Sequence, residues 1–173
     1  MSATALATAP TGSSVEGSGL RHPAELQIVV FELGDERYGL DIATVYEIIR
    51  HQPITAVPKA PAFVEGVINL RGRIIPVVDL RDRFGMAESD LTKASRIVVA
   101  DAGGTRVGLV VDGVSEVLMI AGDAIEPTPD VASNADHEYL RGIAKLGDRL
   151  IILLSLDGLF GATEQSALAA TAA

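Results

Sequence analysis

The polar residues that could do chemistry gather in one stretch, VEGVINLRGRIIPVVDLRDRFG, at residues 64–85. Arg71 and Arg73 stand at a turn between two apolar runs, and acidic residues alternate with arginines at positions 79–83. A guanidinium at a hairpin tip can form paired hydrogen bonds to a carboxylate of another molecule. These arginines therefore either face a partner or serve as ordinary solubilising surface.

No group of residues in the sequence predicts catalysis or metal binding. The three histidines, His22, His51 and His137, lie far apart, no cysteine is present, and no HxxH or HExxH pattern occurs. A nucleophile needs a base beside it, and a metal site needs closely spaced ligands. Asp79 and Asp82 are three residues apart, but their alternation with arginines favours a self-neutralising surface strip. We expect no catalytic residue, no cofactor and no metal.

Composition and charge narrow the class of partner. The formal net charge of -9 disfavours nucleic acid, and Arg71 and Arg73 have no adjacent aromatic residue on which a base could stack. The segment AGGTRVG at residues 102–108 lacks the lysine of a phosphate-binding loop and is predicted to be a turn. The chain has no cysteine, no basic leader and no apolar run of about 18 residues, which predicts a soluble intracellular protein.

Short β-rich segments separated by turns make up most of the chain. Valine, isoleucine and leucine supply most of the apolar residues, and only 4% of residues are aromatic, which favours strands. Three hairpins are predicted, in which 26–33 pairs with 36–40, 96–101 with 106–112, and 142–146 with 149–156. A further turn at 112–113 leads into a strand at 114–120. This pattern is typical of a small β-barrel or sandwich.

Two short helical segments are predicted between the strands. In DIATVYEII at 41–49, apolar residues recur at helical spacing: Ile42, Val45, Tyr46 and Ile49. Asp41 can cap the first turn of this helix, and a shorter helical turn at 61–65 should end at Gly66. Pro76 cannot donate a backbone hydrogen bond, so its strand is expected at a sheet edge or beside a bulge.

The chain is expected to form one domain at 24–160 between two flexible tails, 1–23 and 161–173. The strands fall into two groups, at about 26–85 and 94–156. Each group alone is near the size at which a hydrophobic core becomes marginal, so the two should pack together and leave a seam. With no catalytic constellation, such a body is best suited to recognising other proteins.

Four segments resemble the CheW family of chemotaxis coupling proteins. They are FELGDERYGLDIATVYEII (31–49), PAFVEGVINLRGRIIPVVDLRDRFG (61–85), RVGLVVDGVSEVL (106–118) and YLRGIAKLGDRLIILLSLDGLF (139–160). The resemblance runs from residue 26 to residue 160 with the segments in order. It implies a mainly β fold of two packed, five-stranded SH3-like β-barrels with short connecting helices, and a protein that is not an enzyme.

The resemblance also implies the partners. Members of this family are adaptors that couple the cytoplasmic tips of chemoreceptors, the methyl-accepting chemotaxis proteins, to the regulatory domain of the histidine kinase CheA. The resemblance further implies rings with other CheW-like domains. It also implies a cytoplasmic protein that is recruited to membrane-associated receptor arrays and does not enter the membrane. Two alternatives stay open: a coupler of a non-chemotactic chemosensory pathway, and a small-barrel nucleic-acid-binding protein.

Four positions match the family residues implicated in receptor binding in a groove between the barrels: Val45, Glu47, Gly66 and Arg71. Val45 could equally belong to the core, and Gly66 could serve only backbone geometry. Kinase contacts are expected in the segment between Arg106 and Leu118, without individual assignments. Arg73 departs from the apolar or small residue that the family usually has at this position.

Overall fold

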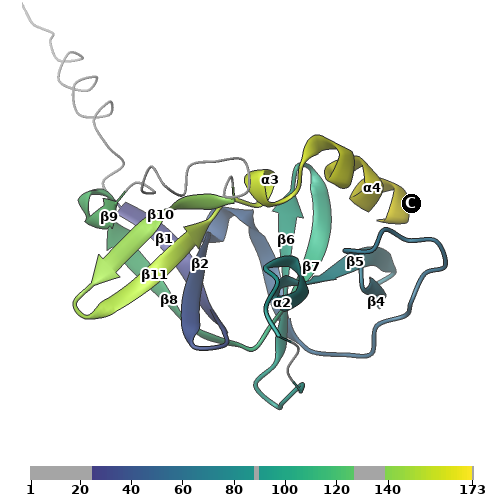
Figure 1. The fold of residues 1–173 in the computed structure, drawn as a ribbon, viewed down its shortest axis with the longest axis horizontal. Helices are drawn as coiled ribbons and strands as arrows, with labels where there is room; N and C mark the ends of the chain where they lie inside the picture. Colours follow the sequence, from purple (N-terminus) through teal and green to yellow (C-terminus); the bar gives the residue numbers. More distant parts are fainter. Residues whose placement is uncertain (1–24, 88–89, 127–138, 173) are drawn as a thin grey trace, which may run out of the picture.

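The computed structural model describes residues 25–87, 90–126 and 139–172. Figure 1 shows two strongly curled sheets side by side, with few helices. The elements are β1 (Glu25–Leu33), β2 (Glu36–Asp41), η1 (Ile42–Thr44), β3 (Val45–Arg50), β4 (Gly66–Leu70), β5 (Arg73–Asp79), α2 (Leu80–Arg83), β6 (Arg96–Ala102), β7 (Thr105–Val111), β8 (Gly113–Ala121), η2 (Gly122–Ala124), β9 (Ile125–Glu126), β10 (Leu140–Leu146), β11 (Arg149–Leu154), α3 (Leu156–Leu159) and α4 (Ala162–Ala172).

The two sheets form the two-barrel arrangement that the sequence predicted, with one extra strand. One sheet has the order β3-β6-β7-β5-β4, and we call it the five-stranded barrel. The other has the order β8-β1-β2-β11-β10-β9, in which β9 has only two residues, and we call it the six-stranded barrel. All three predicted hairpins are confirmed as antiparallel pairs, β1 with β2, β6 with β7, and β10 with β11.

The predicted division of the chain into barrels at 26–85 and 94–156 is wrong, because the barrels are interleaved. Strands β1 and β2 belong with β8 to β11, and the five-stranded barrel is built from the middle of the chain. Two parallel pairings, β2 with β11 and β5 with β7, join strands that are distant in sequence. Local turn signals carry no information about such pairings, so grouping strands by sequence proximity failed.

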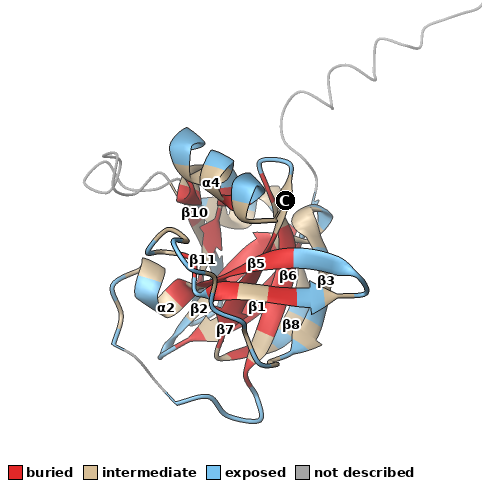
Figure 2. Ribbon diagram, turned by 90° about the vertical axis from the view of Figure 1, so that its right-hand side faces the viewer, coloured by how far each residue is buried: buried red, intermediate tan, exposed pale blue. Residues whose placement is uncertain are grey.

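Three hydrophobic cores hold the barrels together. One fills the six-stranded barrel around Ile28 and Ile151, and another fills the five-stranded barrel around Ile75 and Ile97. The third and largest, the inter-barrel core, takes residues from both sheets, among them Phe31, Leu33, Val98 and Leu109, and also Phe160 after α3. In β1 and β6, alternate residues enter a barrel interior and the inter-barrel core, so both faces are buried and the strands read as nearly continuous apolar runs. In Figure 2 the buried residues run through the centre of the molecule.

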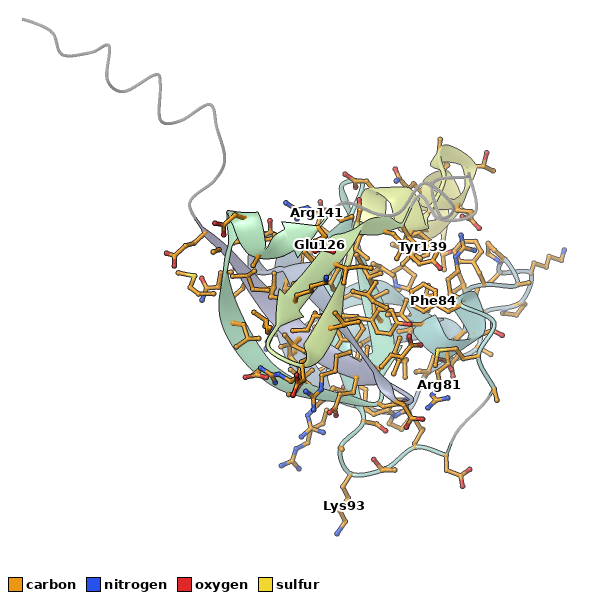
Figure 3. The ribbon with its side chains drawn as sticks, turned by 60° about the vertical axis from the view of Figure 1, so that its left-hand side comes forward. Arg81, Phe84, Lys93, Glu126, Tyr139 and Arg141 are labelled. Atoms are coloured by element: carbon orange, nitrogen blue, oxygen red, sulfur yellow. The ribbon has the colours of Figure 1, made fainter. Side chains whose placement is uncertain are left out.

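The chain passes between the barrels at three places, and an arginine–carboxylate pair lies at each. Where β2 leads to β3, Asp41 lies 3.5 Å from Arg141 of β10. Where β7 leads to β8, the Asp112 carboxylate accepts hydrogen bonds from the Nε and Nη2 of Arg81 on α2, at 3.0 and 2.6 Å. Figure 3 shows Arg141 and Arg81 on different sides of the molecule.

The third passage is made by α3 and α4, which return the chain to the five-stranded barrel. Arg83 of α2 donates two hydrogen bonds to Glu164 of α4, at 2.7 and 2.5 Å. The Arg83 guanidinium also lies 5.5 Å from the ring centres of both Phe63 and Phe160. Aromatic rings continue this junction, since Phe84 and Tyr139 stack with centres 5.0 Å apart (Figure 3).

The helix predicted at 41–49 is wrong. Only Ile42–Thr44 form a short 3-10 turn, which Asp41 caps as expected by accepting a hydrogen bond from the Ala43 N–H at 2.9 Å, and 45–50 form strand β3. A β-bulge between Val45 and Glu47 adds one residue, and together with the turn it imitates helical spacing. The β-branched and aromatic residues of this segment favour the strand.

Two other local predictions are also corrected. The segment 61–65 forms a turn instead of a helix, and Gly66 begins β4. Pro76 lies in β5, which is not an edge strand and shows no bulge there. On the β4 side, its partner Val67 forms both of its backbone hydrogen bonds with Thr55. On the β7 side, the pairing with β5 begins only at Val77. Neither neighbouring strand therefore needs a hydrogen bond from the Pro76 nitrogen.

The predictions of flexible tails can be compared with the structure at the C-terminal end only. The predicted flexible tail at 1–23 lies outside the described residues. From residue 161 a second flexible tail was expected, but 162–172 form α4, whose Leu168 is fully buried in the inter-barrel core. This prediction is wrong because one leucine and the Arg83–Glu164 pair anchor a segment whose alanine-rich composition shows no amphipathic pattern.

Candidate protein-binding site

The turn between β4 and β5 presents Arg71 to solvent. Arg71 and Gly72 both have positive φ angles, 54° and 84°, as a two-residue hairpin turn requires. The side chain of Asn69 holds this turn, because its Oδ1 accepts a hydrogen bond from the Gly72 N–H at 2.9 Å. Arg71 therefore lies at the hairpin tip, as predicted, with 74% of its side chain exposed.

Glu47 of β3 is the partner of Arg71 within the protein. The Arg71 Nη1 donates a hydrogen bond to the Glu47 Oε2 at 2.5 Å. Strands β3 and β4 are the two edges of the five-stranded sheet, so this ion pair links edges that the curl of the sheet brings together. The backbone bridge between Thr55 and Val67, with N–O distances of 2.8 and 2.9 Å, closes the same gap.

The ion pair favours the charged form of both groups. The hydrogen bond from Arg71 lowers the pKa of Glu47, and the bond to Glu47 raises the pKa of Arg71. Arg106 of β7 lowers the pKa of Glu47 further through its charge. Glu47 and Arg71 are therefore both ionised at neutral pH and at the surface, where a partner can reach them.

The other two predicted receptor residues take different positions. Val45 is half-buried and packs against the inter-barrel core. Gly66 is buried at the end of β4 away from the hairpin tip, so the structure does not bring it to Arg71. A Cβ on Gly66 would come closer to the Thr55 carbonyl oxygen than atoms can approach, so backbone packing alone explains this glycine.

Exposed apolar and aromatic residues surround this site, and the sequence did not predict their exposure. Tyr46 and Ile48 of β3 and Ile74 of β5 are exposed although they are large. The Arg106 guanidinium lies 3.9 Å from the ring centre of Tyr46. Tyr46 and Ile48 follow the ordinary alternation of β3, in which positions 46, 48 and 50 are exposed. Because both of these exposed residues are apolar, the alternation does not appear in the hydrophobicity pattern of the sequence.

The segment proposed for kinase contacts is only partly accessible. Val107 and the next four residues of β7 are buried on both faces. Arg106 is partly exposed but lies beside Tyr46 on the five-stranded barrel, so β8 is the accessible part of the segment on the six-stranded barrel. This strand is an edge of the six-stranded sheet, and its Val117 and Met119 are 48% and 59% exposed.

The remaining chemical candidates have structural explanations. Asp79 caps α2 by accepting a hydrogen bond from the Arg81 N–H at 2.9 Å, and the segment 102–108 contains the tip of the β6–β7 hairpin. Across residues 25–87, 90–126 and 139–172, no three histidine, cysteine or acidic side chains are grouped to hold a metal ion. Within the same ranges no helix has the length and apolar character needed to cross a membrane. His22 and His137 lie outside the described residues.

The comparisons with known proteins agree on one family. The model of the CheW-like domain matches residues 27–164. The probable chemotaxis protein CheW of Rhizobium etli is 40% identical over 141 residues, covering 82% of this chain and 91% of the relative. The chemotaxis protein CheW of Klebsiella aerogenes is 38% identical, covering 81% of this chain and 84% of the relative.

A more distant relative and a solved structure extend the comparison. Protein FrzA of Myxococcus xanthus is 30% identical over 147 residues, covering 84% of this chain and 91% of the relative. The crystal structure of scaffolding protein TtCheW from Thermoanaerobacter tengcongensis superposes with a TM-score of 0.73 at 45% identity. It covers 80% of this chain and 94% of the other.

Proposed function

The chain belongs to the CheW family, and from this membership we propose that it is a non-enzymatic adaptor that couples chemoreceptors to the histidine kinase CheA. Chemotaxis is the process for which its relatives are named, and the similar solved structure is titled a scaffolding protein. The observation that carries the proposal is the exposed Arg71–Glu47 ion pair at the junction of β3 and β4.

Arg71 has hydrogen-bonding capacity left for a partner. A guanidinium has five N–H donors, and within the described residues Arg71 donates only from Nη1, to Glu47. A carboxylate or backbone carbonyl at a receptor tip can bind the free side of the fork while Glu47 holds the other side. Val45 and Glu47 lie on the same strand, so we place the receptor contact on Val45, Glu47 and Arg71, with Gly66 as the residue that lets β4 pack against Thr55.

Kinase binding belongs on a different face. We assign it to the outward face of β8, with Val117 inside the predicted segment and Met119 one residue beyond it. Receptor and kinase then occupy the protein at the same time, and no bond is made or broken. A shift at the receptor site changes the free energy of kinase binding through shared contacts, by about 1 to 3 kcal/mol in typical coupled systems. Through these two contacts the protein is recruited to membrane-associated arrays, where it forms rings with other CheW-like domains.

Co-sedimentation with receptor cytoplasmic fragments and with CheA tests this assignment. Arg71→Asp and Glu47→Lys should each weaken receptor binding by about 2 kcal/mol, which is roughly 30-fold, while CheA binding persists. Arg149→Asp is the matched control, because Arg149 forms a similar exposed ion pair with Glu116, at 3.0 Å, on the other barrel. Normal receptor binding by both site variants would remove these residues from the site.

The similarity to FrzA supports a second candidate, a coupler in another chemosensory pathway. Both candidates use the same surfaces and differ in the receptors that they bind. Co-sedimentation with receptor fragments taken from each pathway of the source organism separates them. Binding confined to receptors outside the chemotaxis pathway would favour the second candidate.

A further inference from the structure

We propose that a hollow beside the Arg71–Glu47 pair is a second anchoring point for the receptor and receives a carboxylate next to an aliphatic side chain. This inference rests on the proposed function. The hollow has a volume of about 400 Å³ and is bordered by Tyr46, Arg73, Ile74, Arg106, Ala169 and Ala172. We call it the arginine hollow.

The arginine hollow lies next to the proposed receptor site, because its Arg106 is close enough to Glu47 to lower the pKa of that carboxyl through its charge. Tyr46 precedes Glu47 on β3, and Arg73 follows Arg71 by two residues at the start of β5. Strands β3, β5 and β7 each supply residues to one side of the hollow, and the C-terminal end of α4 supplies another side. This helix packs beside β5 (Figure 1). A partner segment that contacts Arg71 therefore meets the hollow within the same docked surface.

Two arginines of the hollow form no close ion pair within the described residues, although Arg106 acts on Glu47 through its charge. In the part of the chain that the structure describes, Arg73 and Arg106 take part in no ion pair, whereas Arg71, Arg81 and Arg83 each have one. The stack on Tyr46, at 3.9 Å, fixes the Arg106 guanidinium by its face. Stacking leaves the N–H groups at the edge of the guanidinium free to bind a carboxylate.

The charge distribution of the whole chain supports an acidic ligand. Residues 42–111, which contain the five-stranded barrel, carry nine basic and seven acidic residues, whereas the remainder carries five basic and sixteen acidic. In a chain of net charge -9, the hollow is thus a basic feature on the less acidic barrel. Such a surface attracts an acidic partner and lowers the affinity for basic ones.

The apolar residues that border the hollow indicate that its ligand also carries an apolar group. Tyr46 and Ile74 are 50% and 38% exposed, and Ala169 and Ala172 of α4 leave space between them and the arginines. Residues three or four apart on a helix lie on the same face, so a helical segment can present a carboxylate and an aliphatic side chain together. The geometry therefore points to an acidic, apolar-faced helix of the receptor as the occupant.

Binding of a receptor cytoplasmic fragment, measured by isothermal titration calorimetry, tests the proposal. Arg73→Gln and Arg106→Gln should each weaken binding about tenfold, the effect of losing one hydrogen bond to a charged group. Arg50→Gln is the control, because Arg50 is also an exposed arginine of β3 with no ion pair in the described residues, but it lies outside the hollow. It should change affinity about twofold or less.

A second variant tests the volume of the hollow without changing its charge. Ala169 is exposed on α4, so Ala169→Phe should place a ring in the hollow, leave the thermal unfolding midpoint close to that of the wild type, and weaken binding as the arginine variants do. Full receptor affinity in Ala169→Phe, Arg73→Gln and Arg106→Gln would overturn the inference.

The experiment separates this inference from the proposed function. If Arg71→Asp loses receptor binding while the hollow variants behave like Arg50→Gln, the inference fails and the proposed function stands. If Arg71→Asp also binds normally, the proposed receptor site itself fails. Arg106→Gln could also keep normal receptor binding and instead lose binding to single-stranded DNA or self-association. Either result would assign the hollow to a different partner and overturn the proposal.

Discussion

At the scale of single residues, the two charged residues of the site are positioned in different ways. The hairpin turn positions Arg71, and only the folded sheet brings Glu47 close to it. Arg71 could be placed at a hairpin tip from the sequence, because the two-residue turn around Gly72 is a local signal. Its contact with Glu47 could not, because these residues are 24 apart in sequence and meet only when the sheet curls. The sequence therefore named both residues as receptor contacts, which stays a prediction, but it gave no sign that they interact with each other.

Substitution of Gly66 tests whether this glycine is needed for backbone packing or for contact with the receptor. The Gly66→Ala variant should lose about 1 to 3 kcal/mol of unfolding free energy, because the added Cβ overlaps the Thr55 carbonyl. Urea denaturation of the purified variant measures this loss. A variant as stable as the wild type that fails to bind receptor would show that Gly66 contacts the partner directly.

At the scale of elements, hairpins were predictable and the segments with mixed signals were not. The hairpins follow from glycine-containing turns between apolar runs, as at 34–35 and 147–148. The error at 41–49 arose because the bulge at Tyr46 imitates helical periodicity. The error at α4 arose because its anchoring groups, Arg83 and the socket for Leu168, lie elsewhere in the chain.

The helix α4 should depend on its single buried leucine. Leu168→Ala should destabilise the protein by about 2 to 5 kcal/mol, because it leaves a cavity in the inter-barrel core. Hydrogen exchange should show faster exchange of the amides at 162–172 than of those in β6 and β7. Leu91→Ala serves as the control, since Leu91 is 58% exposed and its substitution should change stability by about 0.5 kcal/mol or less. Equal effects of the two substitutions would contradict the packing described for α4.

At the scale of the whole molecule, the two barrels are joined by the inter-barrel core and by three arginine–carboxylate pairs at the chain passages. The sequence predicts that two barrels pack together, because each group of strands alone is near the size at which a hydrophobic core becomes marginal. It could not predict which strands belong to which barrel, because the parallel pairs β2–β11 and β5–β7 leave no local signal. Among the described residues, the predicted seam is filled by the side chains of the inter-barrel core, and hollows lie at its margins.

The passage at Asp112 should make stability depend on pH. Hydrogen bonds from Arg81 lower the pKa of Asp112, so its contribution to stability is present above the ordinary carboxyl pKa and is lost as the pH falls through the lowered value. Asp112→Asn should therefore be less stable than the wild type at neutral pH, with a difference that shrinks below about pH 4. Thermal unfolding across this pH range measures both values.

The control for this prediction is Glu126→Gln. Glu126 forms a more exposed ion pair with Lys145, at 3.0 Å, on the six-stranded barrel and away from the passage at Asp112. Its loss should change stability by about 1 kcal/mol or less. A difference between Asp112→Asn and the wild type that stays constant at all pH values would show that the pKa of Asp112 is the same in the folded and unfolded chains.

The interleaved order of the strands has a consequence for biosynthesis. As the ribosome makes the chain from the N-terminus, β3 to β7 emerge together and can close the five-stranded barrel early, whereas β1 and β2 must wait for the last strands of the chain. During that interval the waiting hairpin exposes the apolar side chains that later enter two cores, among them Ile28 and Phe31. Nascent chains that stall before β11 is made should therefore be the ones that chaperones hold and that aggregate most readily.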